Sequence, residues 1–233
     1  MIFRQFFDYE TYTYTYIIAD EKTKEAAIID SVDINAERDA QYAKELGLDV
    51  KYLMETHVHA DHITGVSELK KYFPNAKSVV SKFGGTECTD IYTDDGDVFN
   101  LGEMKIKVLS TPGHTNGCVS FYTDGMVFTG DSLFARGTGR TDFQNGDAGK
   151  LYDGIVQKLF VLPDDTVVYP GHDYKGALYS TIGEEKQFNP RLAGKTRDEF
   201  IEIMNNLKLP HPKKISESVP ANLKCGNKDL VSV

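Results

Sequence analysis

The sequence lacks an apolar run long enough to cross a bilayer, so no membrane-spanning helix is expected. Basic residues are in deficit, because 26 Lys and Arg face 35 Asp and Glu and give a net charge of −9. Nucleic acids and anionic lipids both require a basic surface, so neither nucleic acid nor membrane is an expected partner. The three cysteines form no CxxC pair, and an odd number indicates no disulfide framework. Free thiols in a reducing compartment, the cytoplasm, are therefore predicted.

The composition is that of a globular protein, and 233 residues fit one domain. Apolar residues change between strand-like and helical spacing along the chain. Strands are predicted at residues 11–19, 26–29, 50–54, 78–80, 104–109, 119–128 (with a hairpin turn at 123–125) and 166–169, and helices at 36–46, 63–73, 151–160 and 196–207. The last residues are rich in turn formers and are expected to wrap the surface. This order predicts a mixed α/β or α+β protein whose strands are covered by helices.

Histidine placement is the strongest functional signal. Five of the six histidines lie in three short polar clusters, and each cluster directly follows a predicted strand. A carboxylate, Asp131, follows the apolar run at 126–128 in the same way. Strand ends are where sheet proteins place their ligands. Seven candidate metal ligands gather there: His57, His59, Asp61, His62, His114, Asp131 and His172.

The spacing within the first cluster has a geometric consequence. Alternate residues of an extended loop point the same way, so His57 and His59 can face one ion together. Asp61 and His62 follow the bend and can face a neighbouring position. Imidazole and carboxylate without thiolate suit zinc, iron or manganese. Taken singly, each residue has a structural alternative, since one buried histidine is usually a hydrogen-bonded core residue and Asp61 could be a helix N-cap. The joint pattern favours a metal site.

These motifs resemble the metal-binding signature of the metallo-β-lactamase superfamily. They occupy residues 56–62, 112–114, 130–131 and 171–172. The resemblance implies an α+β fold, an αββα sandwich in which two mixed β-sheets pack together between flanking helices. The signature covers hydrolases, nucleases, flavoproteins and dioxygenases, so it indicates the fold better than the reaction.

Several downstream segments are similar to the persulfide dioxygenases, the family that includes the ethylmalonic encephalopathy protein. They are residues 136–144, 172–174, 189–192, 209–212 and 219–222. The resemblance implies a single metallo-β-lactamase-like domain over residues 1–233, with a family-specific tail from about residue 173. One departure is Thr138, where cysteine is expected in many relatives.

The resemblance also implies a metal centre of one Fe(II) per chain. Its catalytic ligands would be His57, His114 and Asp131, a facial triad whose open positions suit O₂ activation at non-haem iron. The other four candidates would then orient ligands, hold water or be remnants of a second metal site: His59, Asp61, His62 and His172. Every residue of a binuclear site is present, so the residue count leaves two zinc ions open as an alternative.

The reaction implied by the resemblance is oxidation of glutathione persulfide by O₂ and water to sulfite and glutathione. Glutathione carries two carboxylates, so cations are expected in the pocket. Arg191 and Tyr174 are the first candidates for substrate binding, and Arg140 is a weaker one because it can pair with Asp142. Cys225 is either an oxidisable thiol near the pocket or a buried structural cysteine, and the second interpretation is favoured. Relatives suggest a homodimer, although no interface is identifiable in the sequence.

The main alternative is a binuclear glutathione-thiolester hydrolase of the glyoxalase II type. Such an enzyme shares the same seven ligands but activates a bridging water. The chain after His172 resembles the dioxygenase tail rather than the helical domain expected of that hydrolase. A β-lactamase is less expected because no export signal is visible, and a binding module would normally have broken ligand positions.

Overall fold

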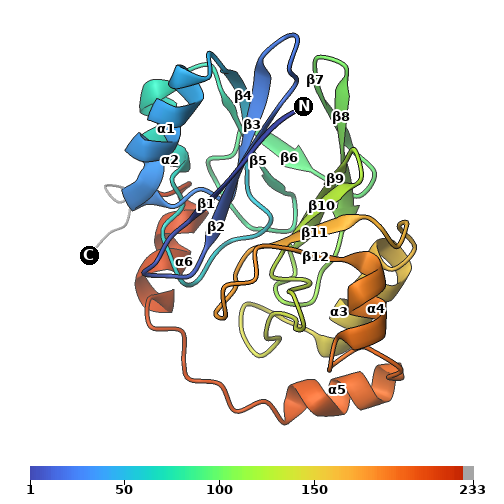
Figure 1. The fold of residues 1–233 in the computed structure, drawn as a ribbon. Coiled ribbons are helices and arrows are strands. Elements are labelled where there is room, and N and C mark those ends of the chain that lie inside the picture. The colour runs from blue at the N-terminus through green and yellow to red at the C-terminus, as the bar shows by residue number, and fades with distance from the viewer. Residues whose placement is uncertain (228–233) are drawn as a thin grey trace.

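The computed structural model describes residues 1–227, whose strands form two six-stranded sheets packed face to face (Figure 1). The first sheet has the order β1 (Ile2–Phe7), β2 (Tyr14–Ala19), β3 (Glu25–Ile29), β4 (Asp49–Met54), β5 (Lys77–Ser81) and β6 (Ile91–Thr93). The second has the order β12 (Ser180–Thr181), β11 (Val167–Pro170), β10 (Met126–Gly130), β9 (Val119–Thr123), β8 (Met104–Ser110) and β7 (Val98–Leu101). Both sheets contain parallel and antiparallel pairs, so the predicted sandwich of two mixed sheets is confirmed.

Helices cover the outer face of each sheet (Figure 1). Apolar residues of α1 (Ala36–Glu45) and α2 (Val66–Tyr72) pack on the first sheet. The second sheet is covered by α3 (Ala148–Gly154), the π-helical turn Ile155–Leu159, α4 (Ile182–Phe188) and α5 (Arg197–Asn205). A short 3₁₀ turn, Asp33–Asn35, precedes α1, and α6 (Ile215–Leu223) lies beside the first sheet. None of the helices within residues 1–227 is both long and apolar enough to cross a membrane.

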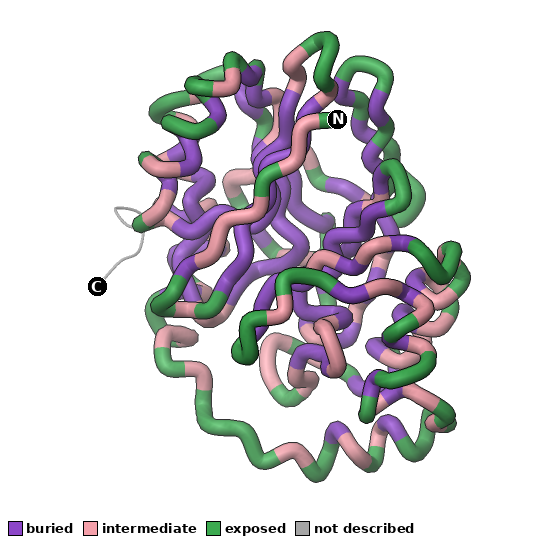
Figure 2. Tube along the Cα trace, in the orientation of Figure 1, coloured by how far each residue is buried: buried purple, intermediate pink, exposed green. Residues whose placement is uncertain are grey.

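Burial follows from this layering (Figure 2). Every residue of β2 is buried, because the strand is covered on both faces. Tyr16 and Ile18 point into the core between the sheets, whereas Ile17 and Ala19 pack against the α1 and α2 side. Side chains of a strand alternate between faces, so one strand contributes to two apolar cores.

Several local predictions are confirmed. The helix predicted from residue 36 begins at Ala36, and the helix predicted from residue 196 is present as α5, with a capping box formed by Thr196 and Glu199. The hairpin turn is present, with Asp124 and Gly125 at positive φ between β9 and β10. Such angles suit the tight turns that join antiparallel strands.

Other elements differ from the prediction. The tail contains α6 instead of turns, because burial of Ala221 and Asn222 stabilises a helix despite an internal Pro220. No strand was predicted at β1, whose residues are mostly half-buried and show no clean alternation. The division into one domain and a tail from about residue 173 stays a prediction.

Candidate metal centre

The ends of four strands supply the seven candidate ligands. The loop 57–62 follows β4 of the first sheet, and His114 follows β8 of the second. Asp131 and His172 follow β10 and β11, which are parallel neighbours, so both residues leave the sheet at the same edge. The structure thus brings all seven residues together at one end of the sandwich, in the two connected groups described next.

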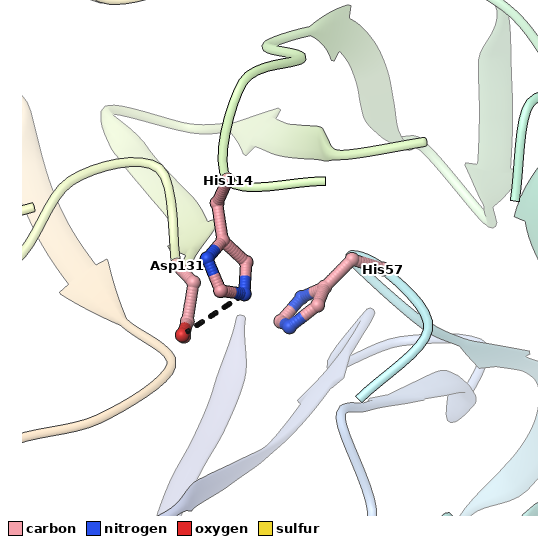
Figure 3. A group of neighbouring side chains, drawn as sticks. All are labelled: His57, His114 and Asp131. Carbon is pink, nitrogen blue, oxygen red and sulfur yellow. Dashed lines mark ion pairs between the residues drawn. The ribbon is translucent and has the colours of Figure 1, made fainter. Parts of the chain in front are cut away.

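The first group is His57, His114 and Asp131 (Figure 3). One potential ligand atom from each residue lies within 4.8 Å of the other two. His114 Nε2 is 3.5 Å from Asp131 Oδ2, the contact marked by the dashed line. The three side chains converge from three separate loops, and two imidazoles with one carboxylate are the donor set of a facial triad.

A backbone carbonyl fixes the ring of His114. His114 Nδ1 lies 2.7 Å from the carbonyl oxygen of Arg140, and a carbonyl only accepts, so Nδ1 carries the proton. Nε2 is then the unprotonated nitrogen, and it is the one facing Asp131. A histidine whose second nitrogen is held in this way is oriented for metal binding.

His57 is oriented by a chain of hydrogen bonds that begins at Asp30. The Asp30 carboxylate accepts from both Thr56 N (2.7 Å) and Thr56 Oγ1 (2.8 Å). Because the hydroxyl proton is donated to Asp30, Thr56 Oγ1 accepts from His57 Nδ1 at 3.0 Å. Nε2 of His57 is thereby left free. Gly130 is needed for this packing, since a Cβ at its positive φ would clash with Thr56 Oγ1.

The second group is His59, Asp61 and His62, whose ligand atoms also lie within 4.8 Å of one another. His172 joins both groups, because its Nε2 is 3.5 Å from Asp61 Oδ2 and 3.4 Å from Asp131 Oδ1. Thr13 lies among them, with its hydroxyl 3.4 Å from Nδ1 of both His62 and His172.

Buried polar atoms without hydrogen-bond partners test whether a metal fits here. Within the described part of the chain, His59 Nδ1, His62 Nε2 and Asp131 Oδ1 are such atoms. Leaving a buried polar atom unpaired costs about 1–3 kcal/mol, and three such atoms at one place suit a bound cation. The buried thiol of Cys118 belongs to neither ligand group and instead contacts Thr115, and burial raises its pKa to about 12. The donor set therefore fits a metal bound by imidazole and carboxylate.

The charge states of His57 and Asp61 agree with this fit. Burial lowers the pKa of His57 well below its ordinary value, and nearby His59 and His114 add to the shift, so the ring is neutral. Burial alone would raise the pKa of Asp61, but His62 and His172 hold it well below the ordinary value. Neutral imidazole and ionised carboxylate are the forms that bind metals.

Two buried carboxylates that contact His59, those of Asp30 and Glu55, were not predicted from the sequence. His59 Nε2 lies 3.3 Å from Asp30 Oδ1 and 3.1 Å from Glu55 Oε2, which turns Nδ1 toward the ligand groups. Burial alone would lower the pKa of His59, but these carboxylates raise it well above the usual range. A signal existed for Asp30, which directly follows the apolar run 26–29 just as Asp131 follows its own strand.

A cavity of about 480 Å³ opens beside the ligand groups. Its walls include Asp61, His114, Asp131 and His172 on the metal side. The same walls carry basic residues: Arg136, Arg140, Lys175, Arg191, His211 and Lys213. A pocket of this size that combines metal ligands with basic side chains suits an anionic small molecule.

Arg191 is the predicted substrate residue that the structure supports best. Its Nη1 donates to the carbonyl oxygen (2.7 Å) and hydroxyl (3.0 Å) of Thr138, the position where cysteine was expected. Within residues 1–227, the hydrogen bonds of the Arg191 side chain go to Thr138 and Met204 and none to a carboxylate, and burial lowers its pKa. A half-buried guanidinium without a counter-charge is suited to an incoming carboxylate.

The other two substrate candidates differ in their freedom to bind. Arg140 pairs with Asp142 at 2.6 Å and donates to Pro210 O at 2.7 Å, so the anticipated structural pairing is present. Tyr174 lines the cavity, is 65% exposed, and lies flat beside the His172 ring with 6.0 Å between the ring centres. Tyr174 is thus free to contact a ligand.

The cysteines contradict the sequence prediction. Cys88 and Cys225 form a disulfide across 137 residues, and the free cysteine, Cys118, is buried. The expectation of free thiols is therefore wrong for Cys88 and Cys225. Cys225 is neither a free oxidisable thiol nor a free buried cysteine, because it is disulfide-bonded. The pairing could not be read from an odd count and wide spacing.

The fold and the seven converging ligands define the class of protein. The family model described as "Metallo-beta-lactamase superfamily" matches residues 8–172, and the chain belongs to that superfamily. A human protein named "Persulfide dioxygenase ETHE1, mitochondrial" is 46% identical over 97% of this chain and 89% of its own. The crystal structure of ETHE1 from Myxococcus xanthus matches with a TM-score of 0.95 and 51% identity, covering 97% of this chain and 100% of that one.

The chain is therefore a member of the ETHE1 persulfide dioxygenase family, as the motifs predicted. A more distant relative, named a probable hydroxyacylglutathione hydrolase in Schizosaccharomyces pombe, is 34% identical over 76% of this chain and 81% of its own.

Proposed function

We propose that this protein is a persulfide dioxygenase, an oxidoreductase that converts glutathione persulfide, O₂ and water to sulfite and glutathione. Membership of the family supports the reaction class, since relatives covering nearly the whole chain are named for it. The observation that supports glutathione persulfide as the substrate is the position of Arg191. This cation has no carboxylate partner in the described chain, and it lines the cavity beside the metal ligands.

The proposed cofactor is one Fe(II) per chain, bound by His57, His114 and Asp131. Both histidines present Nε2 because their Nδ1 atoms are held by an oxygen, and Asp131 offsets part of the metal charge. When bound, the iron supplies the redox step with O₂, which side chains alone do not perform. His114 and Asp131 line the cavity, so reactants bound there would lie beside a metal held by these residues.

The remaining four candidates are proposed to support this centre rather than to bind iron. These four residues lie against one another, and His172 also contacts Asp131, which keeps the ligand loops in place: His59, Asp61, His62 and His172. Thr13 contacts His62 and Asp30 contacts His59, so both help to orient the same group. Groups that orient metal ligands typically change metal affinity or activity by about 10–100-fold when removed.

Arg191 is proposed to bind a carboxylate of the glutathione moiety, and Tyr174, which lines the same cavity, to contact the peptide. Arg140 contributes less, because its guanidinium is already paired with Asp142. These contacts are made to the part of the substrate that lies far from the persulfide, so the persulfide sulfur is left to face the metal ligands. Fixing both reactants in one site removes much of the entropy cost of their encounter.

The second candidate function is hydrolysis of a glutathione thiolester by two metal ions. The group His59, Asp61 and His62 favours it, because these residues could hold a second ion.

The cytoplasmic location stays a prediction, since the expectation of free cysteines on which it rested is wrong and the mammalian relatives are named as mitochondrial. A homodimer stays a prediction as well.

One set of assays, on protein loaded with either iron or zinc, distinguishes the two functions. The iron form should bind about one metal per chain and consume O₂ only when glutathione persulfide is added. The zinc form should be inert, because zinc has no accessible redox change. Brisk cleavage of a glutathione thiolester, with no persulfide-dependent O₂ uptake by the iron form, would establish the hydrolase instead.

A further inference from the structure

One side chain of the tail contacts the metal-binding loop through its backbone. Asn222, at the end of α6, is 4% exposed. Its Nδ2 donates to the carbonyl oxygens of His59 and His62, both at 2.8 Å, and its Oδ1 accepts from Thr64 N at 2.8 Å. All these bonds are buried, and both amide protons are used.

These bonds matter because the loop has little regular structure of its own. Residues 55–65 lie between β4 and α2 and form neither helix nor strand. His59 and His62 carry two of the unpaired ring nitrogens described above, and the backbone that aims those rings is bound to Asn222. A shift of α6 would therefore move both rings relative to the ligand groups.

The position of α6 depends in turn on a few contacts. Cys225, three residues after Asn222, is disulfide-bonded to Cys88 in the loop after β5. Beside the disulfide, Glu87 N donates to Leu223 O at 3.0 Å, and Lys224 pairs with Glu87 at the surface. Burial of Ala221 and the ion pair of Lys214 with Glu10 also hold the helix, and the disulfide adds a covalent link across 137 residues at its C-terminal end.

The helix itself is weak. It has nine residues and contains Pro220, which removes one helical hydrogen bond. The preceding residues 206–214 form an extended connection from α5 at the other side of the molecule (Figure 1). A cavity of only about 10 Å³ lies between the disulfide and the loop, lined by Asn222, Cys225, His57 and His59.

We propose that Asn222 is a positioning residue for the metal-binding loop and that the Cys88–Cys225 disulfide keeps Asn222 in place, so that reducing this disulfide loosens the metal site. The proposal rests on the metal centre proposed above. Both cysteines are half-buried, so small thiols can reach the bond. One thiol attacks a sulfur, forms a mixed disulfide and releases the first cysteine as a thiol. A second thiol then attacks the sulfur of the first small thiol, so the two small thiols leave as their oxidised disulfide and the protein keeps two cysteine thiols. Glutathione, a product of the proposed reaction, belongs to this class of reductant.

The contribution of Asn222 is tested with Asn222→Ala, Asn222→Asp and the control Asn206→Ala. Asn206 is exposed and bonds only the backbone of its own helix, so its loss should change nothing. Asn222→Ala should weaken metal retention against a chelator by about 10–100-fold. Asn222→Asp keeps the acceptor for Thr64 N but cannot donate to the two carbonyls, so it should lose as much. Full metal retention by both Asn222 variants would overturn the positioning role.

The contribution of the disulfide is tested on the intact wild type with a phosphine reductant, which contributes no thiolate to the metal. Alkylation and mass spectrometry count the thiols that appear. Reduction should speed metal loss to the chelator and hydrogen exchange of the Thr64 amide by about 10-fold or more. Cys88→Ser should show the faster rates without reductant and no response to it, which excludes a direct effect of the phosphine.

Equal rates for oxidised and reduced wild type would overturn the proposal. Both readouts concern metal retention and backbone protection rather than O₂ uptake. A protein that failed as a dioxygenase but lost metal on reduction would therefore contradict the proposed function and leave this inference standing.

Discussion

The role of Arg191 can be tested by replacing it with alanine. Its Nη1 is occupied by Thr138, so the rest of the guanidinium is available to a substrate carboxylate. A charge-assisted hydrogen bond is worth about 1.5–3 kcal/mol. Arg191→Ala should therefore lower kcat/KM for glutathione persulfide about 10–150-fold. Most of the loss should appear in KM, because a contact far from the reacting sulfur is made equally in ground state and transition state.

The assay compares two substrates, glutathione persulfide and a small alkyl persulfide without carboxylates. If Arg191 binds a carboxylate, the variant should lose activity on the first substrate and keep that of wild type on the second. Arg197→Ala is the matched control, since Arg197 is exposed, pairs with Asp153 and lies outside the cavity. Equal losses on both substrates, or unchanged kinetics on glutathione persulfide, would refute the reasoning.

Three further predictions concern the ligands, the packing beneath them and a buried acid elsewhere. Asp131→Ala should abolish metal binding while His59→Ala keeps a measurable fraction, about 10–100-fold weaker; the reverse order of metal contents would show that the ligand assignment is wrong. Gly130→Ala should lower the free energy of unfolding by about 1–3 kcal/mol in urea titrations, because the residue has positive φ and its Cβ would clash with Thr56; unchanged stability would contradict the packing argument. Burial raises the pKa of Asp39 to about 6 although Arg38 opposes it, so ionisation costs folded-state stability as the pH rises from about 4 to 7. Asp39→Asn should therefore gain on wild type by up to about 3 kcal/mol over that range, and a constant difference between the two proteins would exclude the shift.

The fold and ligand set could be predicted because both leave local signals. A ligand that follows an apolar strand is visible in sequence, and the short spacing from His57 to His62 brings several ligands together within one loop. The structure brings all seven candidates together, and the family predicted from the motifs is confirmed. The assignment of iron to three of them stays a proposal.

The parts that were missed depend on contacts between distant segments. Asp30 is one of 35 acidic residues, and only folding places it beneath His59. The Cys88–Cys225 pair spans 137 residues, and no local spacing indicates it. The sequence around Pro220 predicts turns, whereas the structure has a helix there. Burial of Asn222 against the metal-binding loop stabilises this helix, and local sequence does not indicate that contact. Sequence periodicity reports local propensity, whereas these features are set by tertiary packing.

The central claim is that the protein couples O₂ to a persulfide sulfur. The most direct test measures O₂ uptake and sulfite formation together, with iron-loaded protein and limiting glutathione persulfide. The reaction adds one O₂ and one water to one persulfide and yields one sulfite and one glutathione, so the account predicts about one O₂ consumed for each sulfite formed. Sulfite formed without O₂ uptake, or O₂ uptake that continues without persulfide, would contradict it.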